Sequence, residues 1–398
     1  MILPSDQGGR SGDIRRQILW YAIMAPSPLN TQPWSVLCRD PCGIDLYLEK
    51  KRLLSHMDPA SRQACVSCGA FIENLDIAAR EAGFMAEISL LPSSLPGADI
   101  DLGQPLARIE LMPDPGIVTD PLFSWLEKRH TNRSVFTNDP IPAEIISSLA
   151  DAANQPFTTL GFSADPSFRQ ELGGHITNAV EVAFSAPDRF SEFLSYVRIP
   201  PISGYQYPDG YGAREIGLHG VRGWLSFLPL RISPAGRRNG LARELLLRLA
   251  RKGTESAAAF GWIATKGNSR HDQIRAGRTY ERVHLTAASA GVSLQPMTCV
   301  LESYPGMDDH YRRVLDLLGI PDTHTVQMLF RLGYSPSPAQ SRRWAVQDFS
   351  GDDEAAAPQW ITLLTLPAAF RGQQDRGPLH RARAELYTGE SPVRSHPR

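Results

Sequence analysis

The stretch Ala25-Pro26-Ser27-Pro28-Leu29-Asn30-Thr31-Gln32-Pro33-Trp34 decides how this chain is interpreted. Its prolines fix the backbone, while Ser27, Asn30 and Gln32 supply short polar side chains. Such a rigid turn can present main-chain and amide hydrogen bonds to the edge of a flat ligand. The alternative is purely structural: a helix ends before Pro26, a strand begins at Trp34, and Asn30 bonds within its own turn.

The sequence on either side of this turn predicts short, regular elements. Charged and apolar positions alternate at helical spacing over residues 13–24, and the proline that follows ends the helix. Residues 34–38 and 44–48 predict a hairpin around an Asp-Pro-Cys-Gly turn. Further strands are expected at residues 87–91 and 107–112.

Two longer segments predict core helices of the same kind. In residues 65–82, apolar side chains recur every three or four positions, and a glycine follows as a helix end. Residues 276–290 have the same pattern, and aligning Gly69 with Gly277 pairs five identical residues at an offset of 208. The repeat predicts two related halves in one chain, whereas two unrelated alanine-rich helices are the alternative.

The composition is that of an ordinary globular protein. The 398 residues carry 42 acidic and 41 basic side chains, so no excess charge directs the chain toward nucleic acid or an anionic membrane. The longest apolar stretches are shorter than the ~20 residues that cross a bilayer, and no secretion signal opens the chain. We therefore expect a cytoplasmic protein with neither nucleic acid nor membrane as a partner.

The cysteines allow one alternative site. Five cysteines are an odd number, which argues against a disulfide framework. Cys38, Cys42, Cys65 and Cys68 have a spacing that a tetrahedral zinc site can use. Because Cys65 and Cys68 begin a predicted core helix, buried free thiols are favoured and no metal site is predicted.

Three segments together resemble the FMN-dependent nitroreductase family. The opening turn matches the Pro-Ser-x-x-Asn-x-Gln-Pro-Trp signature of that family, and Arg129-His130-Thr131-Asn132-Arg133 is similar to its Arg-x-Ser/Thr-x-Lys/Arg string. The third segment, residues 330–334, precedes a basic pair at Arg342 and Arg343. The resemblance covers residues 15–343 and implies an α+β, nitroreductase-like fold.

The two flavin-binding elements fall in different parts of the chain. In the family, flavin lies at a dimer interface, where one subunit supplies the turn and the other supplies the arginine string. Here residues 14–118 keep only the turn and residues 119–345 keep only the string. This complementary loss resembles the Acg-like FMN-binding branch, whose chains are fused dimers with one flavin and a lid. The resemblance implies a pseudo-dimer in one monomeric chain, with a lid at residues 191–230 and a Pro/Arg-rich tail at 346–398.

The resemblance also implies which residues bind FMN. Arg129 with Arg342 or Arg343 would hold the phosphate, because guanidinium groups match phosphate oxygens in pairs. A solvated charge in the tail is the alternative for the last two. Thr131 would bond the ribityl chain or the phosphate, and Arg133 the pyrimidine edge of the ring. The remaining members of the expected set are Pro26, Ser27, Asn30, Gln32, Pro296 and Thr298.

The resemblance implies an oxidoreductase that takes hydride from NAD(P)H and reduces a small electrophile, such as a nitro compound or a quinone. Nitroreductases commonly carry a Glu-Gly pair after the long helix, where a backbone N–H bonds flavin N5. Residues 294–299 lack this pair. A flavin-binding or flavin-sequestering protein with little turnover is therefore the alternative. No catalytic side chain is predicted, because the cofactor carries the chemistry.

Overall fold

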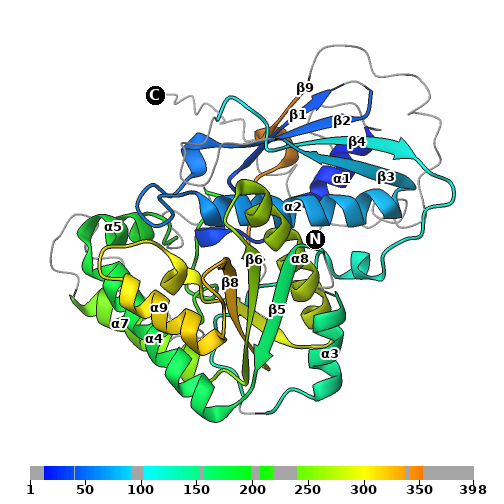
Figure 1. Ribbon diagram of the computed structural model, residues 1–398. Coiled ribbons are helices and arrows are strands. Elements are labelled where there is room, and N and C mark those ends of the chain that lie inside the picture. The colour runs from blue at the N-terminus through cyan, green and yellow to red at the C-terminus, as the bar shows by residue number, and fades with distance from the viewer. Residues whose placement is uncertain are drawn as a thin grey trace, which may run out of the picture.

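The computed structural model describes residues 13–39, 41–91, 102–137, 139–152, 156–198, 207–218, 240–336 and 341–352. These residues form two separate β-sheets with long helices between and around them (Figure 1). The mixture confirms the α+β class.

The first sheet has the strand order β3-β4-β2-β1-β9. The expected hairpin is confirmed, since β1 and β2 pair in antiparallel register. Trp34, Val36 and Cys38 alternate into the core along β1, which is the period that makes a half-buried strand. In chain order, the elements from the first helix to β4 are α1 (Ile14–Ala22), η1 (Pro28–Asn30), β1 (Trp34–Arg39), β2 (Gly43–Leu48), η2 (Lys50–Arg52), α2 (Arg62–Glu81), β3 (Phe84–Leu90) and β4 (Ala107–Pro113).

The second sheet has the strand order β5-β6-β8-β7. The expected helix at 276–290 is confirmed but begins earlier, because Ser269 and Asp272 form a capping box at its start. The elements of this part are η3 (Pro121–Trp125), α3 (Ala143–Ala152), β5 (Thr158–Ser163), α4 (Pro166–Ser185), α5 (Pro187–Ser195), α7 (Gly240–Glu255), β6 (Ala259–Lys266), α8 (Arg270–Ser289), β7 (Ser293–Pro296), η5 (Thr298–Leu301), α9 (Asp308–Leu318) and β8 (His324–Gly333).

The two sheets share one topology. Reading β3-β4-β2-β1 against β7-β8-β6-β5 matches the strands in chain order, and the neighbours within both sets pair antiparallel. A long helix follows the second strand of each set, α2 in the first and α8 in the second. The repeated order supports the prediction of two related halves.

The helices α2 and α8 pack against each other at their aligned glycines. A Cβ added to Gly69 would lie 2.0 Å from the Ile274 carbonyl oxygen, and one added to Gly277 would lie 2.0 Å from the Val66 carbonyl oxygen. Gly69 and Gly277 are 208 residues apart, and so are Val66 and Ile274, so the two contacts are equivalent under this offset. Reciprocal contacts of this kind are those of a two-fold interface. The fused pseudo-dimer stays a prediction, and this contact supports it.

The second half contains a large insertion. Residues 40–42 join β1 to β2, whereas residues 164–258 join the corresponding strands β5 and β6. Within the insertion, α4, α5 and α7 pack with α9 around a separate apolar cluster, seen at the lower left of Figure 1. Of the expected lid, residues 199–206 and 219–230 lie outside the described residues.

The expected tail boundary is too early. Residues 346–352 form η6 (Val346–Asp348) and β9 (Ser350–Asp352), and β9 adds to the first sheet in parallel with β1. Phe349 is buried in the first core, which explains why this segment is held. The rest of the expected tail, residues 353–398, lies outside the described residues.

All five cysteines are free, and four of them are buried. Burial raises the pKa of the Cys65 thiol to about 12, so it stays protonated at neutral pH. Within the described ranges, no three His, Cys, Asp or Glu side chains are grouped as a metal site would need. The same residues include no helix with the length and apolarity to span a membrane.

We expect Gly69→Ala to destabilise the protein strongly. The added methyl would meet backbone, which cannot swing aside, so the free energy of unfolding should fall by at least about 1–3 kcal/mol. Gly174→Ala is the matched control, because Gly174 is exposed on α4 with no atom within 4 Å of its added Cβ. It should gain roughly 0.5–1 kcal/mol. Urea unfolding measures both, and equal stability of Gly69→Ala and the parent would contradict the helix contact.

Candidate functional site

The turn after α1 is held in an uncommon backbone conformation. Leu29, Asn30 and Gln32 have φ values of 48°, 55° and 53°. Non-glycine residues in this left-handed region cost about 1–3 kcal/mol each and persist where the surroundings fix them, often at ligand sites. Ser27 contributes to that fixing, since the Gln32 N–H donates to its Oγ at 2.9 Å. The strain favours a ligand-binding turn over a simple helix stop.

A cavity of about 280 Å³ opens beside this turn. Its wall is formed by the turn, by α2 and α8, by the stretch after β7 and by the inserted helices. Six of the residues expected from the sequence line it: Pro26, Ser27, Thr131, Arg133, Pro296 and Thr298. Segments from both halves of the chain therefore meet at one site.

Arg133 is the charged side chain among the lining residues. Its guanidinium lies 4.1 Å from the ring centre of Tyr211. It also donates to the Tyr211 hydroxyl at 2.5 Å and to the Glu215 carbonyl at 3.3 Å. These contacts fix the orientation of the guanidinium at the wall.

Arg129 does not line the cavity. It is buried, donates to the Met24 carbonyl at 2.6 Å and pairs with Glu281 at 2.9 Å. A third contact, of 3.2 Å, joins it to His284 Nδ1. Arg129 thus joins the end of α1 to α8, and its expected role toward a phosphate stays a prediction.

The side chains of Asn30 and Gln32, in the turn, form a polar network with residues 342–344. Arg343 donates to Asn30 Oδ1 at 3.0 Å and to the Ile23 carbonyl at 2.7 Å. Asn30 Nδ2 donates to the Arg342 carbonyl at 3.1 Å, and Gln32 Oε1 accepts from the Trp344 N–H at 2.9 Å. Residues 342–344 are therefore packed against the turn. The structure brings the basic pair to the site without putting either member on the cavity wall.

Positive charge near the turn is only partly compensated. Arg343 and the buried Arg331 both have a pKa lowered to about 9, chiefly by burial, and both remain cations at neutral pH. Among the described residues, Glu281 is the carboxylate that acts on Arg343, and none acts on Arg331. With Arg129 and Arg133, these arginines make a buried environment that favours an anion.

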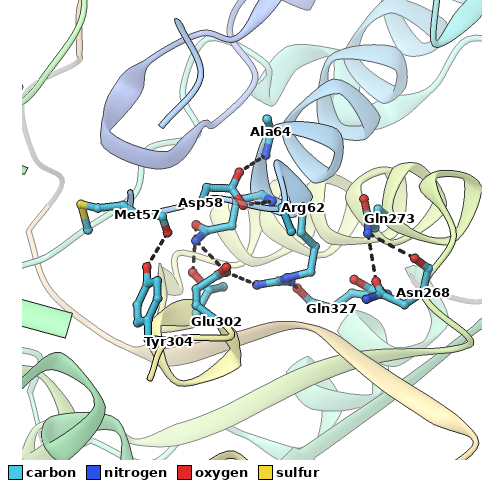
Figure 2. Close-up of polar contacts among 12 residues, drawn as sticks. Met57, Asp58, Arg62, Ala64, Asn268, Gln273, Glu302, Tyr304 and Gln327 are labelled. Atoms are coloured by element: carbon cyan, nitrogen blue, oxygen red, sulfur yellow. Dashed lines mark hydrogen bonds and ion pairs between the residues drawn. The ribbon is translucent and has the colours of Figure 1, made fainter. Parts of the chain in front are cut away.

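The other wall of the cavity is backed by an acidic network (Figure 2). Arg62 and Glu302 form a buried ion pair, and Asp58 accepts from the Ala64 N–H at 2.9 Å at the start of α2. Burial, and then the neighbouring Glu302, raise the pKa of Asp58 to about 7. Gln63, which lines the cavity, donates to Glu302 Oε1 at 2.8 Å.

Tyr280 places an unsatisfied group at the cavity. Its side chain lines the cavity from α8, and its hydroxyl is buried without a hydrogen-bond partner among the described residues. Burial raises the pKa of this phenol well above its usual range, so it stays a hydrogen-bond donor. A buried donor without a partner costs about 1–3 kcal/mol, which a bound ligand could recover.

Sequence reasoning missed Gln63, Tyr280, Glu302 and Arg331. Gln63 and Tyr280 lie in α2 and α8, and the periodicity of these two segments predicts core helices, not a cavity wall. Arg331 occurs inside the apolar strand β8, and a charge in such a strand is the one signal that could have singled it out.

We expect the stability difference between Glu281→Gln and the parent to depend on pH. Burial raises the pKa of Glu281 from 4.5 to about 7, although Arg129 opposes the shift. The folded parent therefore binds a proton that the unfolded chain has lost, so its stability falls as pH rises from about 4.5 to 7. A glutamine side chain cannot titrate, so the variant should improve relative to the parent over this range. Urea unfolding at several pH values tests this, and a constant difference would contradict it.

The chain is similar to several known proteins. No family model matches the chain. It is 26% identical over 334 residues to "Putative NAD(P)H nitroreductase Rv3131" of Mycobacterium tuberculosis, covering 81% of this chain and 85% of the relative. The acg protein of that organism, which bears the same description, is 32% identical over 81 residues, or 20% of this chain and 24% of acg.

Among solved structures, the FMN-dependent nitroreductase NfnB of Mycobacterium smegmatis, in complex with NADPH, overlaps 60% of this chain and 94% of its own. The identity is 15% and the TM-score is 0.33, so the assignment rests on the sequence relatives. The similarity to Rv3131 extends over most of the chain. The chain is therefore similar over most of its length to a protein named as a nitroreductase and, over a shorter stretch, to acg.

Proposed function

We propose that the cavity binds FMN and that the chain is an NAD(P)H-dependent oxidoreductase acting on a small electrophile, such as a nitro compound or a quinone. One observation carries the proposal: the turn at Pro26–Ser27 and the string at Thr131–Arg133, which lie far apart in the sequence, line the same cavity. The relation to Rv3131, which is named as a nitroreductase, supports it.

The residues present fit this cofactor. FMN carries an anionic phosphate and a flat ring with hydrogen-bonding edges. The incompletely compensated charge of Arg331 and Arg343 suits the phosphate. The unpartnered hydroxyl of Tyr280 suits an acceptor on the ring or on the ribityl chain.

The chain's own residues bind and orient. Arg133 and Thr131 would hold the cofactor from the second half, while Pro26 and Ser27 would border it from the first. When bound, FMN supplies the chemistry, accepting hydride from NAD(P)H and passing two electrons to the substrate. The apolar lining from the inserted helices, including Phe184, excludes water from the reacting edge.

One observation favours the alternative, a flavin-binding protein with little turnover. The segment 207–218 is tied to the site from two directions. Gln32 Nε2 donates to the Pro208 carbonyl at 3.0 Å, and Tyr211 is held by Arg133. A segment fixed in this way restricts access of a second substrate to the cavity.

We expect the protein to bind FMN at least about tenfold more tightly than riboflavin, because a charge-assisted phosphate contact contributes roughly 1.5–3 kcal/mol. Arg133→Gln should weaken both ligands by a similar factor, since Arg133 is assigned to the ring. Arg251→Gln, at an exposed site on α7, is the control and should change neither affinity. Fluorescence titration of the apoprotein measures all three.

The same titration gives the stoichiometry, which should be about one FMN per chain because each half has lost the element that the other keeps. Equal affinities for FMN and riboflavin would argue against a phosphate site. Two flavins per chain would argue against the complementary halves.

Anaerobic mixing with NADH or NADPH should bleach the flavin absorbance near ~450 nm if the chain is an oxidoreductase. Hydride transfer requires the nicotinamide to reach the ring, so bleaching reports access as well as chemistry. If dithionite bleaches the bound flavin and neither nicotinamide does, the alternative of flavin storage replaces the proposed activity.

A further inference from the structure

The Thr298 hydroxyl lies at the cavity wall, and its hydrogen is directed toward Gln63. Thr298 Oγ1 donates to Gln63 Oε1 at 3.1 Å. Both residues line the cavity, Thr298 at the start of η5 and Gln63 in the first turn of α2. A hydroxyl has a single hydrogen, so a Thr298 that donates to Gln63 can only accept from a ligand.

Glu302 sets the direction of the hydrogen bond between Thr298 and Gln63. Gln63 Nε2 donates to Glu302 Oε1 at 2.8 Å. An ionised carboxylate only accepts, so the Gln63 amide must turn its NH₂ toward Glu302 and its oxygen toward Thr298. The reverse orientation would set two acceptors, the oxygens of Gln63 and Glu302, against each other.

The charge on Glu302 is in turn held by Arg62. These two side chains form a buried ion pair, and Arg62 also donates to the Gln327 carbonyl, as Figure 2 shows. Asp58 is the second carboxylate of the network, and burial raises its pKa to about 7. Near neutral pH the network can therefore take up a proton at Asp58.

Among the described residues, no donor reaches Thr298 Oγ1, whose residue is 9% exposed. A hydroxyl oxygen at a cavity wall that receives no hydrogen bond is available to accept one from a ligand. Most of the neighbouring wall is apolar, with Met297, Leu54 and Met57 among the lining side chains. A polar ligand atom on this side of the cavity has few other partners.

We propose that the Glu302–Gln63–Thr298 chain fixes Thr298 as a hydrogen-bond acceptor, so that this wall selects a ligand presenting an N–H group. This inference rests on the proposed function and deepens it. Two N–H groups have the required chemistry, the imide N–H of the flavin ring and the carboxamide NH₂ of a nicotinamide. Gln63 and Glu302 act as positioning residues, since they set the polarity of a group that they do not themselves present.

Two pairs of ligands distinguish the sources, with binding rather than turnover as the readout. In the first arm, FMN is compared with FMN methylated at the imide nitrogen. In the second arm, the FMN-loaded protein is titrated with NAD⁺ and with its 3-acetylpyridine analogue, in which a methyl ketone replaces the carboxamide. The parent protein should favour the N–H ligand by roughly tenfold or more in one arm, since an unmatched buried acceptor costs about 1–3 kcal/mol.

Three variants separate the hydrogen bond from steric effects. Thr298→Val keeps the shape and removes the acceptor, so it should lose the preference, whereas a steric clash with the added methyl would persist. Thr298→Ser keeps the hydroxyl and should keep the preference. Gln63→Leu leaves Thr298 intact but frees its hydroxyl to rotate, and it should reduce the preference to within a few-fold. Thermal unfolding of each variant checks that the fold is retained.

The outcomes are distinguishable from failure of the proposed function. FMN binding by the parent with no preference in either arm overturns this inference alone. An undiminished preference in Gln63→Leu also overturns it, because the orientation would then not depend on the chain. No FMN binding by the parent overturns the proposed function and this inference with it.

Discussion

The close approach of two helix backbones at Gly69 and Gly277 sets the positions of everything around the cavity. With no side chain at either position, α2 and α8 lie near enough for backbone to touch backbone. Each helix then carries one part of the wall: Gln63 comes from α2 and Tyr280 from α8. A larger residue at Gly69 or Gly277 would push the two helices apart. The glycine contact carries no functional group, yet it sets the distance between the cavity walls that Gln63 and Tyr280 form.

The cavity is electrically uneven. On one side, Arg343 bonds the turn and Arg331 bonds Gln295 of the cavity wall, and burial lowers the pKa of both arginines. Carboxylates gather behind the opposite wall, where Asp58 and Glu302 share Arg62. A ligand with a negative group at one end and hydrogen-bond donors at the other would be aligned by this field. Orientation thus comes from charges that mostly lie behind the wall, in surroundings of low polarity where they act strongly.

The sequence allowed the local elements to be predicted, but not the partners that the fold brings together. Periodicity was sufficient for α2 and for the β1–β2 hairpin, because both signals are complete within one segment. Arg129 was identified from a short string, yet its contacts with Met24 and Glu281 come from distant elements. Tyr280 could not be recognised at all, since an aromatic residue at a core position of a helix looks the same whether or not it faces a cavity.

The pairing of β9 with β1 has a consequence for synthesis of the chain. Strand β1 is synthesised early, and among the described residues the strand that covers its outer edge is β9, at residues 350–352. A nascent chain must therefore carry an open sheet edge until nearly all the described residues have left the ribosome. Open edges recruit other strands, which makes them a starting point for aggregation. The long separation of β1 from β9 along the chain gives this protein a vulnerable interval that a protein closing its sheet sooner would not have.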